Sequence, residues 1–448
     1  MSAGLRILVL CPHYEPDTAP TGEIMTILCR HWVERGHRVE IITSLPWYRD
    51  HAVAAGWSGR LLRTQHEVWG RIRRWHPFPS RKGRLVARAV SFAGFTVLAG
   101  ADAVATSRRC DVVFAMSPPL TLGVAGRVAA RMRRVPLVFN VQDVFPDVAV
   151  ETGVLRGSRG VAAARRLERR VYRWANAVTV LSEGMAGNVR AKLDPGDHES
   201  KVVVIPNVVD VDRITPADRH NRYRAELGSG GGSSGRGPDS AASRLGQPGA
   251  ELGSGGGRGP EAIGTVVMYA GNLGYSQSLE LVVAAAERFA GEGRDDVRFV
   301  VNGDGVARPL VAEAARHLDN LTLVGWQPPE RLGEVLAAAD LHLILLRKGL
   351  GASSVPSKVY SVLAAGRPMV AAVDRGSEIE RLLVAAGAGR TVDPDDVDAF
   401  CSTVAEMVDD PSGLAEMGRR ARAYAEQIPS PGQVADRYLE LFQRLARP

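Results

Sequence analysis

Short apolar runs typical of buried strands alternate with segments that are amphipathic at helical spacing, and this alternation recurs in both halves of the chain. In the first half the strand-like runs begin at Arg6, Val39, Asp111, Pro136, Ala177 and Val202. In the second half they begin at Thr265, Val297, Leu321, Leu341, Pro368 and Arg390. Strands that alternate with helices favour parallel sheets covered by helices on both faces. The sequence therefore predicts an α/β fold of two doubly wound, Rossmann-like domains.

The boundary between these domains is predicted after Pro206. We expect an N-terminal domain over 1–206, completed by a C-terminal helix over 430–448, and a second domain over 207–429. The stretch 228–260 holds 13 glycines in 33 residues, and the peptide AELGSGGG occurs at Ala225 and again at Ala250. We interpret this stretch as a disordered insertion in the second domain. Because such sheets bind ligands beyond the carboxyl ends of their strands, the two domains are expected to face a central cleft.

Cysteine spacing and apolar run lengths narrow the protein class. The four cysteines, Cys11, Cys29, Cys110 and Cys401, form no C-x-x-C pair. This pattern favours neither a zinc site nor a disulfide framework, and we expect no bound metal. Arg6 interrupts the apolar start, and no uninterrupted apolar run reaches the roughly 18–20 residues of a membrane span. A cytoplasmic protein without a signal peptide is expected.

Charge is distributed unevenly along the chain. Residues 1–210 carry 30 Lys and Arg against 18 Asp and Glu, a net charge of +12, whereas the remainder carries 26 against 31, a net charge of −5. A cationic first half indicates an anionic partner on that half. Nucleic acid is not expected, because no recognition motif accompanies the basic residues.

The segment Arg60 to Arg88 is the most basic part of the chain. It holds nine Lys and Arg but a single acid, Glu67, and a mostly apolar stretch from Leu85 to Ala105 follows. This composition predicts contact with an anionic membrane surface, or the mouth of a site for a polyprenyl-linked acceptor. The residues proposed for it are Arg71, Arg73, Arg74 and Trp75. A cationic face beside a buried core helix is the alternative.

Nine segments at the predicted strand ends resemble a known family. In chain order they are TAPTGE, ERGHRVEIIT, SPPLTLG, QDVFPD, VIPNVVD, YAGNLGYSQSLE, VNGDG, VPSKVYSVLAAGRPMVA and DRGSEIERL. Together they resemble the family-4 glycosyltransferases of the GT-B fold, in particular the bacterial branch that builds surface polysaccharides on lipid carriers. The resemblance implies an N-terminal acceptor-binding domain and a C-terminal domain for the nucleotide-sugar donor.

The resemblance also implies a reaction. We expect a hexosyl or N-acetylhexosaminyl group to pass from a nucleoside-diphosphate sugar, with UDP the expected nucleotide, to a lipid-linked or polysaccharide-precursor acceptor. Configuration would be retained, and neither metal nor cofactor would be needed. The leaving diphosphate would take the acceptor proton on the same face while the protein stabilises developing charge. The enzyme would work as a peripheral protein on the inner face of the plasma membrane.

Several donor-binding residues follow from the same resemblance. Without a metal, a diphosphate must be met by backbone N–H groups and cations. Ser357 and Lys358 open a predicted helix and are expected to hold it, with Arg347 or Lys348 as possible helpers. Gly271 and Asn272 follow another strand end. Family members often have Arg at the position of Asn272, so the loss of that cation leaves Lys358 as the main candidate.

Two further donor contacts and one close approach are expected. The family often carries two glutamates eight residues apart, and Ser353 and Ser361 occupy those positions here. The second glutamate usually contacts the donor ribose, so a serine at 361 weakens that expectation. Gly22 lies where the family brings backbone close to donor phosphate or acceptor. A simple turn before a helix is the alternative for Gly22, and His13 in the same loop is interpreted as a loop histidine.

Asp143 and Glu378 are the expected catalytic residues. Many family members have His-Asp where this chain has Gln142 and Asp143, so a histidine acid or base is excluded there. Asp143 is expected to orient the acceptor hydroxyl or the donor sugar, and Glu378 to contact sugar hydroxyls. The alternatives are an aspartate that caps a turn and a first-turn helix acid.

Two other functions remain open from the sequence. A nucleotide-sugar epimerase of the GT-B fold would need titratable groups beside the sugar, which Gln142 does not supply. A non-catalytic accessory protein would explain why serines replace the two glutamates.

Overall fold

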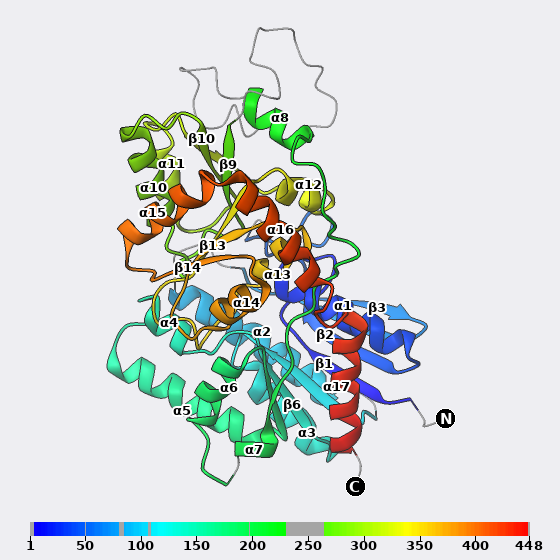
Figure 1. The fold of residues 1–448 in the computed structure, drawn as a ribbon. Helices are drawn as coiled ribbons and strands as arrows, with labels where there is room; N and C mark the ends of the chain where they lie inside the picture. The colour runs from blue at the N-terminus through cyan, green and yellow to red at the C-terminus, as the bar shows by residue number, and fades with distance from the viewer. Residues whose placement is uncertain are drawn as a thin grey trace. The chain divides into compact units, whose positions relative to one another are not determined.

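The computed structural model describes residues 4–49, 51–79, 85–105, 109–196, 198–229 and 264–446. The chain divides into two compact units, each drawn in Figure 1. Unit 1 comprises Met1–Val208, Ala352–Val355 and Pro429–Pro448, and unit 2 comprises Val209–Gly351 and Pro356–Ile428. The sequence places the limits at 206 and 430 and does not predict that 352–355 belongs to unit 1. From residue 230 onward, the predicted insertion 228–260 lies outside the described residues.

Unit 1 is built on an eight-stranded sheet in the order β3-β4-β2-β1-β5-β6-β7-β8. Its strands are β1 (Arg6–Leu10), β2 (Arg38–Ser44), β3 (Leu62–Glu67), β4 (Gly70–Trp75), β5 (Val112–Ser117), β6 (Leu137–Val141), β7 (Ala177–Val180) and β8 (Val202–Val204). Every neighbouring pair is parallel except β3 and β4. The central strands β5, β6 and β7 are buried along their whole length, which fits their uninterrupted apolar sequences.

Helices cover both faces of this sheet. They are α1 (Pro20–Glu34), α2 (Leu85–Ala105), α3 (Leu122–Arg133), α4 (Asp147–Glu151), α5 (Ser158–Trp174), α6 (Glu183–Arg190), α7 (His198–Lys201) and α17 (Pro431–Ala446). The connections through α2, α3 and α5 cross the sheet in the direction opposite to the connection through α1. Since such crossovers are right-handed, these three helices lie on the face opposite α1.

The C-terminal helix α17 packs against α1. The buried ring of Trp32 donates its Nε1–H to the carbonyl oxygen of Ala435 at 3.1 Å. Its ring lies 5.3 Å from that of Phe442, in an edge-to-face arrangement that aromatic pairs prefer. The last helix of the chain is therefore part of the core of unit 1.

Unit 2 holds a six-stranded parallel sheet in the order β11-β10-β9-β12-β13-β14. Its strands are β9 (Thr265–Ala270), β10 (Val297–Asn302), β11 (Leu321–Val324), β12 (Leu341–Leu345), β13 (Met369–Ala372) and β14 (Gly389–Val392). Its helices are α8 (Arg222–Ser229), α10 (Glu280–Gly291), α11 (Arg308–Ala314), α12 (Leu332–Ala337), α13 (Lys358–Ala364), α14 (Glu378–Ala386), α15 (Val397–Val408) and α16 (Pro411–Ala425), with a 3₁₀ turn at Pro329–Arg331.

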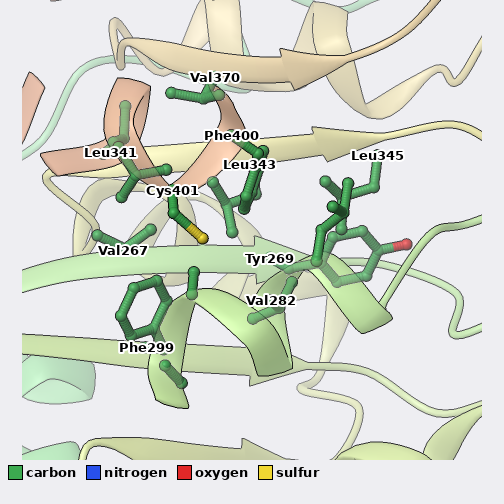
Figure 2. Close-up of a cluster of buried hydrophobic side chains, with 14 of the residues drawn as sticks. Val267, Tyr269, Val282, Phe299, Leu341, Leu343, Leu345, Val370, Phe400 and Cys401 are labelled. Carbon is green, nitrogen blue, oxygen red and sulfur yellow. The ribbon is translucent and has the colours of Figure 1, made fainter. Parts of the chain in front are cut away.

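A buried cluster fills one side of the unit 2 sheet (Figure 2). Val267, Phe299 and Leu343 come from three adjacent strands, and Phe400 of α15 packs onto them. The predicted fold class of two doubly wound parallel-sheet domains is confirmed. None of the helices within the described residues is both long enough and apolar enough to cross a membrane.

The sequence missed the antiparallel pair β3 and β4. Both strands lie inside the basic segment Arg60 to Arg88, for which the sequence predicts a membrane contact or the mouth of a site for a polyprenyl-linked acceptor. Strand β4 is inserted between β3 and β2, so its alternating side chains face the two helical layers of unit 1. From its sequence alone, a strand rich in arginine is expected to be exposed to solvent. Its arginines are buried only because they pair with residues far away in the chain, which a local pattern does not reveal.

Candidate functional site

Lys358 lies at the carboxyl end of β9 in unit 2. Its Nζ donates to the hydroxyl oxygen of Tyr269 at 2.5 Å and lies 3.7 Å from the centroid of the Tyr269 ring. The Tyr269 hydroxyl in turn donates to the carbonyl oxygen of Asn272 at 2.7 Å. Figure 2 shows this hydroxyl directed away from the apolar cluster against which the ring packs. A tyrosine of the core therefore fixes a lysine ammonium at the edge of the sheet.

Two glycines create the space around this ammonium. Gly271 has a φ of 146°, and a Cβ placed there would lie 3.1 Å from Lys358 Nζ. A Cβ at Gly303 would lie 1.9 Å from the carbonyl oxygen of Gly271. The loops after β9 and β10 can approach this closely only because both positions lack a side chain. The need for glycine at 271 thus follows from its contact with Lys358.

The surroundings of Lys358 change its protonation. Burial lowers the pKa of its ammonium to about 7, because an apolar environment disfavours the charged form. An anionic ligand beside Nζ would favour the charged form again. The side chain is therefore suited to bind an anion near neutral pH.

The two basic neighbours suggested from the sequence are already paired. Arg347 Nη2 lies 3.2 Å from Glu280 Oε1. Lys348 Nζ lies 3.1 Å from an oxygen of Asp393 and 3.2 Å from an oxygen of Asp395. Both residues are thus neutralised by carboxylates, unlike Lys358.

The other donor residues of unit 2 lie at the same carboxyl edge of the sheet. Ser357 immediately precedes α13 and makes no capping hydrogen bond with its side chain. Ser361 is half-buried one turn further along, and Asn272 is exposed in the loop after β9. Glu378 is the first residue of α14, after β13, and Arg381 Nη2 donates to its Oε2 at 2.9 Å. Since β9, β12 and β13 are neighbours in the sheet, their following loops share one edge.

Asp143 follows β6 at the carboxyl edge of the unit 1 sheet. Ser354 donates its hydroxyl hydrogen to Asp143 Oδ1 at 2.6 Å, and the two residues form an isolated antiparallel bridge. The amide of Val144 donates to the carbonyl oxygen of Ser353 at 2.8 Å. Burial raises the pKa of the Asp143 carboxyl, and the hydrogen bond from Ser354 opposes that rise.

Ser353 differs from its expected placement. The sequence assigned it to the donor domain, but its backbone belongs to unit 1 and its residue surface is 2% exposed. Asn188 Nδ2 lies 3.4 Å from Ser353 Oγ and 3.2 Å from Asp147 Oδ2. The pairing of 352–355 with the β6 loop explains this difference, because strand-like pairing over such a distance leaves no local signal in the sequence.

A buried ionic cluster that the sequence did not predict supports this loop. Lys192 Nζ donates to Asp147 Oδ2 and to Glu168 Oε1, both at 2.6 Å. Tyr172 donates its hydroxyl hydrogen to Glu168 Oε1 at 3.0 Å. Burial raises the pKa of Glu168, and the Lys192 charge opposes that rise. Through Lys192 the cluster ties Asp147 of α4 to Glu168 of α5.

Gln142 is fixed by a second buried network. Its Nε2 donates to Asn140 Oδ1 at 2.7 Å, and Asn140 Nδ2 donates to the Tyr438 hydroxyl of α17 at 2.9 Å. The side chain that replaces the family histidine is therefore a neutral amide engaged in the core of unit 1.

His13 and Asp17 form a buried pair in the loop after β1. His13 Nδ1 lies 2.7 Å from Asp17 Oδ2, and the backbone amide of Tyr48 donates to Asp17 Oδ1 at 3.1 Å. Because a carboxylate only accepts, Nδ1 carries the hydrogen of this bond, and Nε2 has no hydrogen-bond partner among the described residues. The His13 ring lies 5.7 Å from the ring of Trp47. The local sequence around His13, which directly follows Pro12, does not predict this pairing.

The packing of the same loop explains why position 22 is a glycine. Its amide donates to the carbonyl oxygen of Ala19 at 2.8 Å, so this N–H is not free to bind a phosphate. A Cβ at Gly22 would lie 3.0 Å from His13 Cβ. The glycine allows the His13 loop to pack onto the first turn of α1.

The four residues proposed for acceptor or membrane contact are engaged inside unit 1. Arg73 Nε and Trp75 Nε1 both donate to Asp102 of α2, at 2.7 Å and 2.6 Å. Arg71 Nη2 donates to Glu40 at 3.1 Å. Arg74 is 1% exposed and donates to Gln65 and to the carbonyl oxygen of Glu15. The burial of Arg74 contradicts a membrane contact at that residue.

Within the described part of the chain, no group of three or more His, Cys, Asp or Glu side chains is placed to hold a metal ion.

Two family models match the chain. The model described as "Glycosyl transferase 4-like domain" matches residues 21–208, and the model described as "Glycosyl transferases group 1" matches residues 264–410. Together they cover more than half of the sequence.

Known proteins show the same likeness. The chain is 22% identical over 436 residues to WcaI of Escherichia coli (strain K12), a protein named for glycosyl transfer in colanic acid biosynthesis, and the match covers 94% of this chain and 96% of WcaI. Sucrose-phosphate synthase from Thermosynechococcus elongatus superposes with a TM-score of 0.69 at 14% identity, covering 98% of this chain and 99% of that chain. HepE of Anabaena, solved with UDP-glucose, superposes with a TM-score of 0.65 at 14% identity, covering 98% and 100%.

Proposed function

We propose a donor and an acceptor for this chain, which belongs to the family-4 glycosyltransferases of the GT-B fold. The donor is a UDP-sugar, and the acceptor is a lipid-linked or polysaccharide-precursor molecule. The transferred group is a hexosyl or N-acetylhexosaminyl group. The name of WcaI supports an acceptor in surface-polysaccharide synthesis, and the UDP-glucose complex of HepE supports the donor class. The reaction retains configuration and uses no metal.

The arrangement of Lys358, Tyr269 and Gly271 is the observation that carries the donor assignment. A UDP-sugar leaves a diphosphate, whose developing charge must be met at the edge of the sheet. The ammonium of Lys358 lies at that edge beside Gly271, which has no side chain to cover it. Gly271 would let the diphosphate approach the backbone, and Lys358 would stabilise its negative charge.

Backbone amides beside Lys358 support the same assignment. The amides of Val359 and Tyr360 donate to the carbonyl oxygens of Pro356 and Ser357. No described residue accepts a hydrogen bond from the amide of Ser357 or of Lys358. Two free N–H groups and one ammonium would together bind the diphosphate. The Ser357 hydroxyl would add a further donor.

The remaining donor contacts come from three side chains of unit 2. Ser361 would contact the ribose through a single hydroxyl, which binds more weakly than the carboxylate usual at this position. Asn272 is exposed beside Gly271 and would contact the donor with its amide. Glu378 would accept hydrogen bonds from sugar hydroxyls, in competition with Arg381.

Asp143 and His13 are proposed to bind the hydroxyl groups of the acceptor. Asp143 lies at the carboxyl edge of the unit 1 sheet and would accept a hydrogen bond from the acceptor hydroxyl. His13 Nε2 would do the same for a second hydroxyl, while Trp47 supplies an apolar ring for a sugar face. During transfer the sugar C1–O bond to the diphosphate breaks and the C1–O bond to the acceptor forms on the same face. The acceptor proton passes to the departing phosphate oxygen.

A transfer assay tests this proposal. The protein is incubated with a UDP-sugar radiolabelled in the sugar, with and without a bacterial lipid extract, and label in the organic phase is counted. The proposal expects extract-dependent transfer that is lost in Lys358→Ala and kept in Lys348→Ala, a matched change at a lysine already neutralised by Asp393 and Asp395. Equal transfer by both variants would remove Lys358 from the donor site.

A further inference from the structure

An open cavity of about 510 Å³ lies on unit 1 between the second half of α5 and residues 191–194. Its lining is strongly cationic, with Asp194 the single acid. The basic lining residues are Arg166, Arg169, Arg170, Arg173 and Lys192. Neither Asp143 nor His13 lines it, so it is separate from the residues proposed for the acceptor.

Three of these cations are uncompensated. Lys192 is bonded to Asp147 and Glu168, and Arg173 Nε lies 3.5 Å from Asp194. Arg166, Arg169 and Arg170 are exposed and have no carboxylate partner among the described residues. Arg166 and Arg170 are four residues apart on one helix, a spacing at which like charges repel. An anion in the cavity would relieve that repulsion.

Helices α2 and α3, which lie on the same face of the sheet as α5, expose apolar side chains. Helix α2 packs on α3, and α3 packs on α5. A Cβ at Gly100 of α2 would lie 3.2 Å from Ala125 Cβ of α3, so these two helices are in close contact. Four apolar side chains of α2 and α3 are exposed: Val90 (65%), Val97 (68%), Val128 (45%) and Met132 (64%). The layer thus combines an apolar surface with a cationic cavity.

We propose that this arginine cavity binds the phosphate headgroups of anionic phospholipids, so that unit 1 docks on a membrane through α2, α3 and α5. Cationic side chains attract the anionic lipid surface, and the neighbouring apolar side chains enter its interfacial region. The inference rests on the proposed function for the presence of a membrane-borne acceptor. It places the membrane contact on these helices instead of at Arg71, Arg73, Arg74 and Trp75.

The chemistry of the cavity favours lipid over nucleic acid. No aromatic side chain lines it, so it offers no ring on which a base could stack. The apolar side chains of α2 and α3 would remain exposed to water on a nucleic acid, whereas a bilayer interface would cover them.

Vesicle co-sedimentation tests the proposal. The full chain is mixed with vesicles of phosphatidylcholine alone, or of equal parts phosphatidylcholine and phosphatidylglycerol. We expect binding only to the second, and weaker binding as salt is added. Since each cation near an anionic surface contributes on the order of fivefold in affinity, the triple change Arg166→Gln, Arg169→Gln and Arg170→Gln should weaken binding roughly 100-fold. The triple change to lysine should retain most of it.

A matched control removes equal charge from unit 2. Arg316, Arg390 and Arg419 are exposed arginines there, and changing them to glutamine should leave vesicle binding unchanged. Thermal melting of each variant establishes that it is folded. Equal loss in both triple variants, or unchanged binding of the α5 variant, would overturn the proposal. The proposal would also be overturned if the protein bound single-stranded DNA through Arg166, Arg169 and Arg170 but did not bind vesicles.

Binding of UDP-glucose separates this inference from the donor assignment. The α5 variant should bind UDP-glucose as the unaltered protein does, because it leaves Lys358 intact. Loss of vesicle binding with intact nucleotide binding supports the lipid site alone. If the protein binds vesicles but not UDP-glucose, the donor assignment is contradicted and the lipid site is still supported.

Discussion

Ser354 donates a hydrogen bond of 2.6 Å to Asp143, although 211 residues separate the two in the chain. The bond joins the tetrapeptide 352–355 to the loop after β6, within unit 1. It also opposes the effect of burial on Asp143, since burial raises the pKa of this carboxyl and the Ser354 hydroxyl lowers it. The charge state of the proposed acceptor residue therefore depends on one distant hydroxyl.

The first prediction concerns this hydroxyl. In Ser354→Ala the pKa of Asp143 should rise further, because only burial then acts on it. The acid limb of the pH–rate profile for transfer should move to higher pH, while Ser354→Thr should keep the original profile. A purely structural role for Ser354 would lower activity equally at every pH and leave the limb in place.

Gly271→Ala should damage both stability and donor binding. The alanine would have to adopt a positive φ, and its Cβ would lie against Lys358 Nζ. A residue forced into such a conformation costs about 1–3 kcal/mol. Thermal melting and UDP-glucose titration would measure the two effects. Gly291→Ala is the control, because no atom lies within 4 Å of a Cβ placed there; similar losses in both variants would contradict the local explanation.

Donor binding should depend on pH through Lys358. Burial lowers the pKa of Lys358 to about 7 in the free protein, and a bound diphosphate raises it. Affinity for UDP-glucose, whose diphosphate does not titrate near neutrality, should be highest below pH 7. Above pH 7 it should fall by up to about tenfold per pH unit, because binding then requires a proton to be taken up.

Lys358→Arg supplies the control for that titration. A guanidinium remains charged throughout this range, so the variant should bind with little dependence on pH. Calorimetric titrations at several pH values would check both proteins. A flat profile for the unaltered protein would mean that Lys358 does not contact the diphosphate.

His13→Ala should reduce transfer to the acceptor and leave donor binding unchanged. Loss of the imidazole removes the proposed contact to an acceptor hydroxyl, and we expect transfer to lipid extract to fall roughly tenfold, as for loss of one or two kcal/mol of hydrogen bonding. UDP-glucose affinity should not change, because the change leaves the proposed donor contacts Lys358, Ser357 and Gly271 intact. Reduced nucleotide affinity would indicate a general structural defect instead of an acceptor contact.

The fold could be predicted from the sequence because its signal is local. Apolar runs such as the one beginning at Asp111 are long enough to identify buried strands of a parallel sheet. The resemblance of the loop segments then gave the family, which the family models confirm. The hairpin β3–β4 was missed because its arginines are satisfied by residues such as Asp102 and Glu40, which no local pattern reveals.

The site was predicted less completely. The roles of Lys358, Asp143 and Glu378 stay predictions, although the structure adds partners for each of them. Ser353 was named as a donor residue because it occupies the first of the two glutamate positions of the family, whereas pairing with the β6 loop assigns it to unit 1. The pair of His13 and Asp17 was missed because its recognition requires the path of the loop after β1.

Titration of UDP into the unaltered protein and into Lys358→Ala is the sharpest test of whether Lys358 binds the diphosphate, with Lys348→Ala as the control. The expected result is that UDP binds the unaltered protein and Lys348→Ala equally, and that Lys358→Ala loses roughly tenfold or more in affinity, as for a charged hydrogen bond of about 1.5–3 kcal/mol. Equal affinity of Lys358→Ala and the unaltered protein would contradict it.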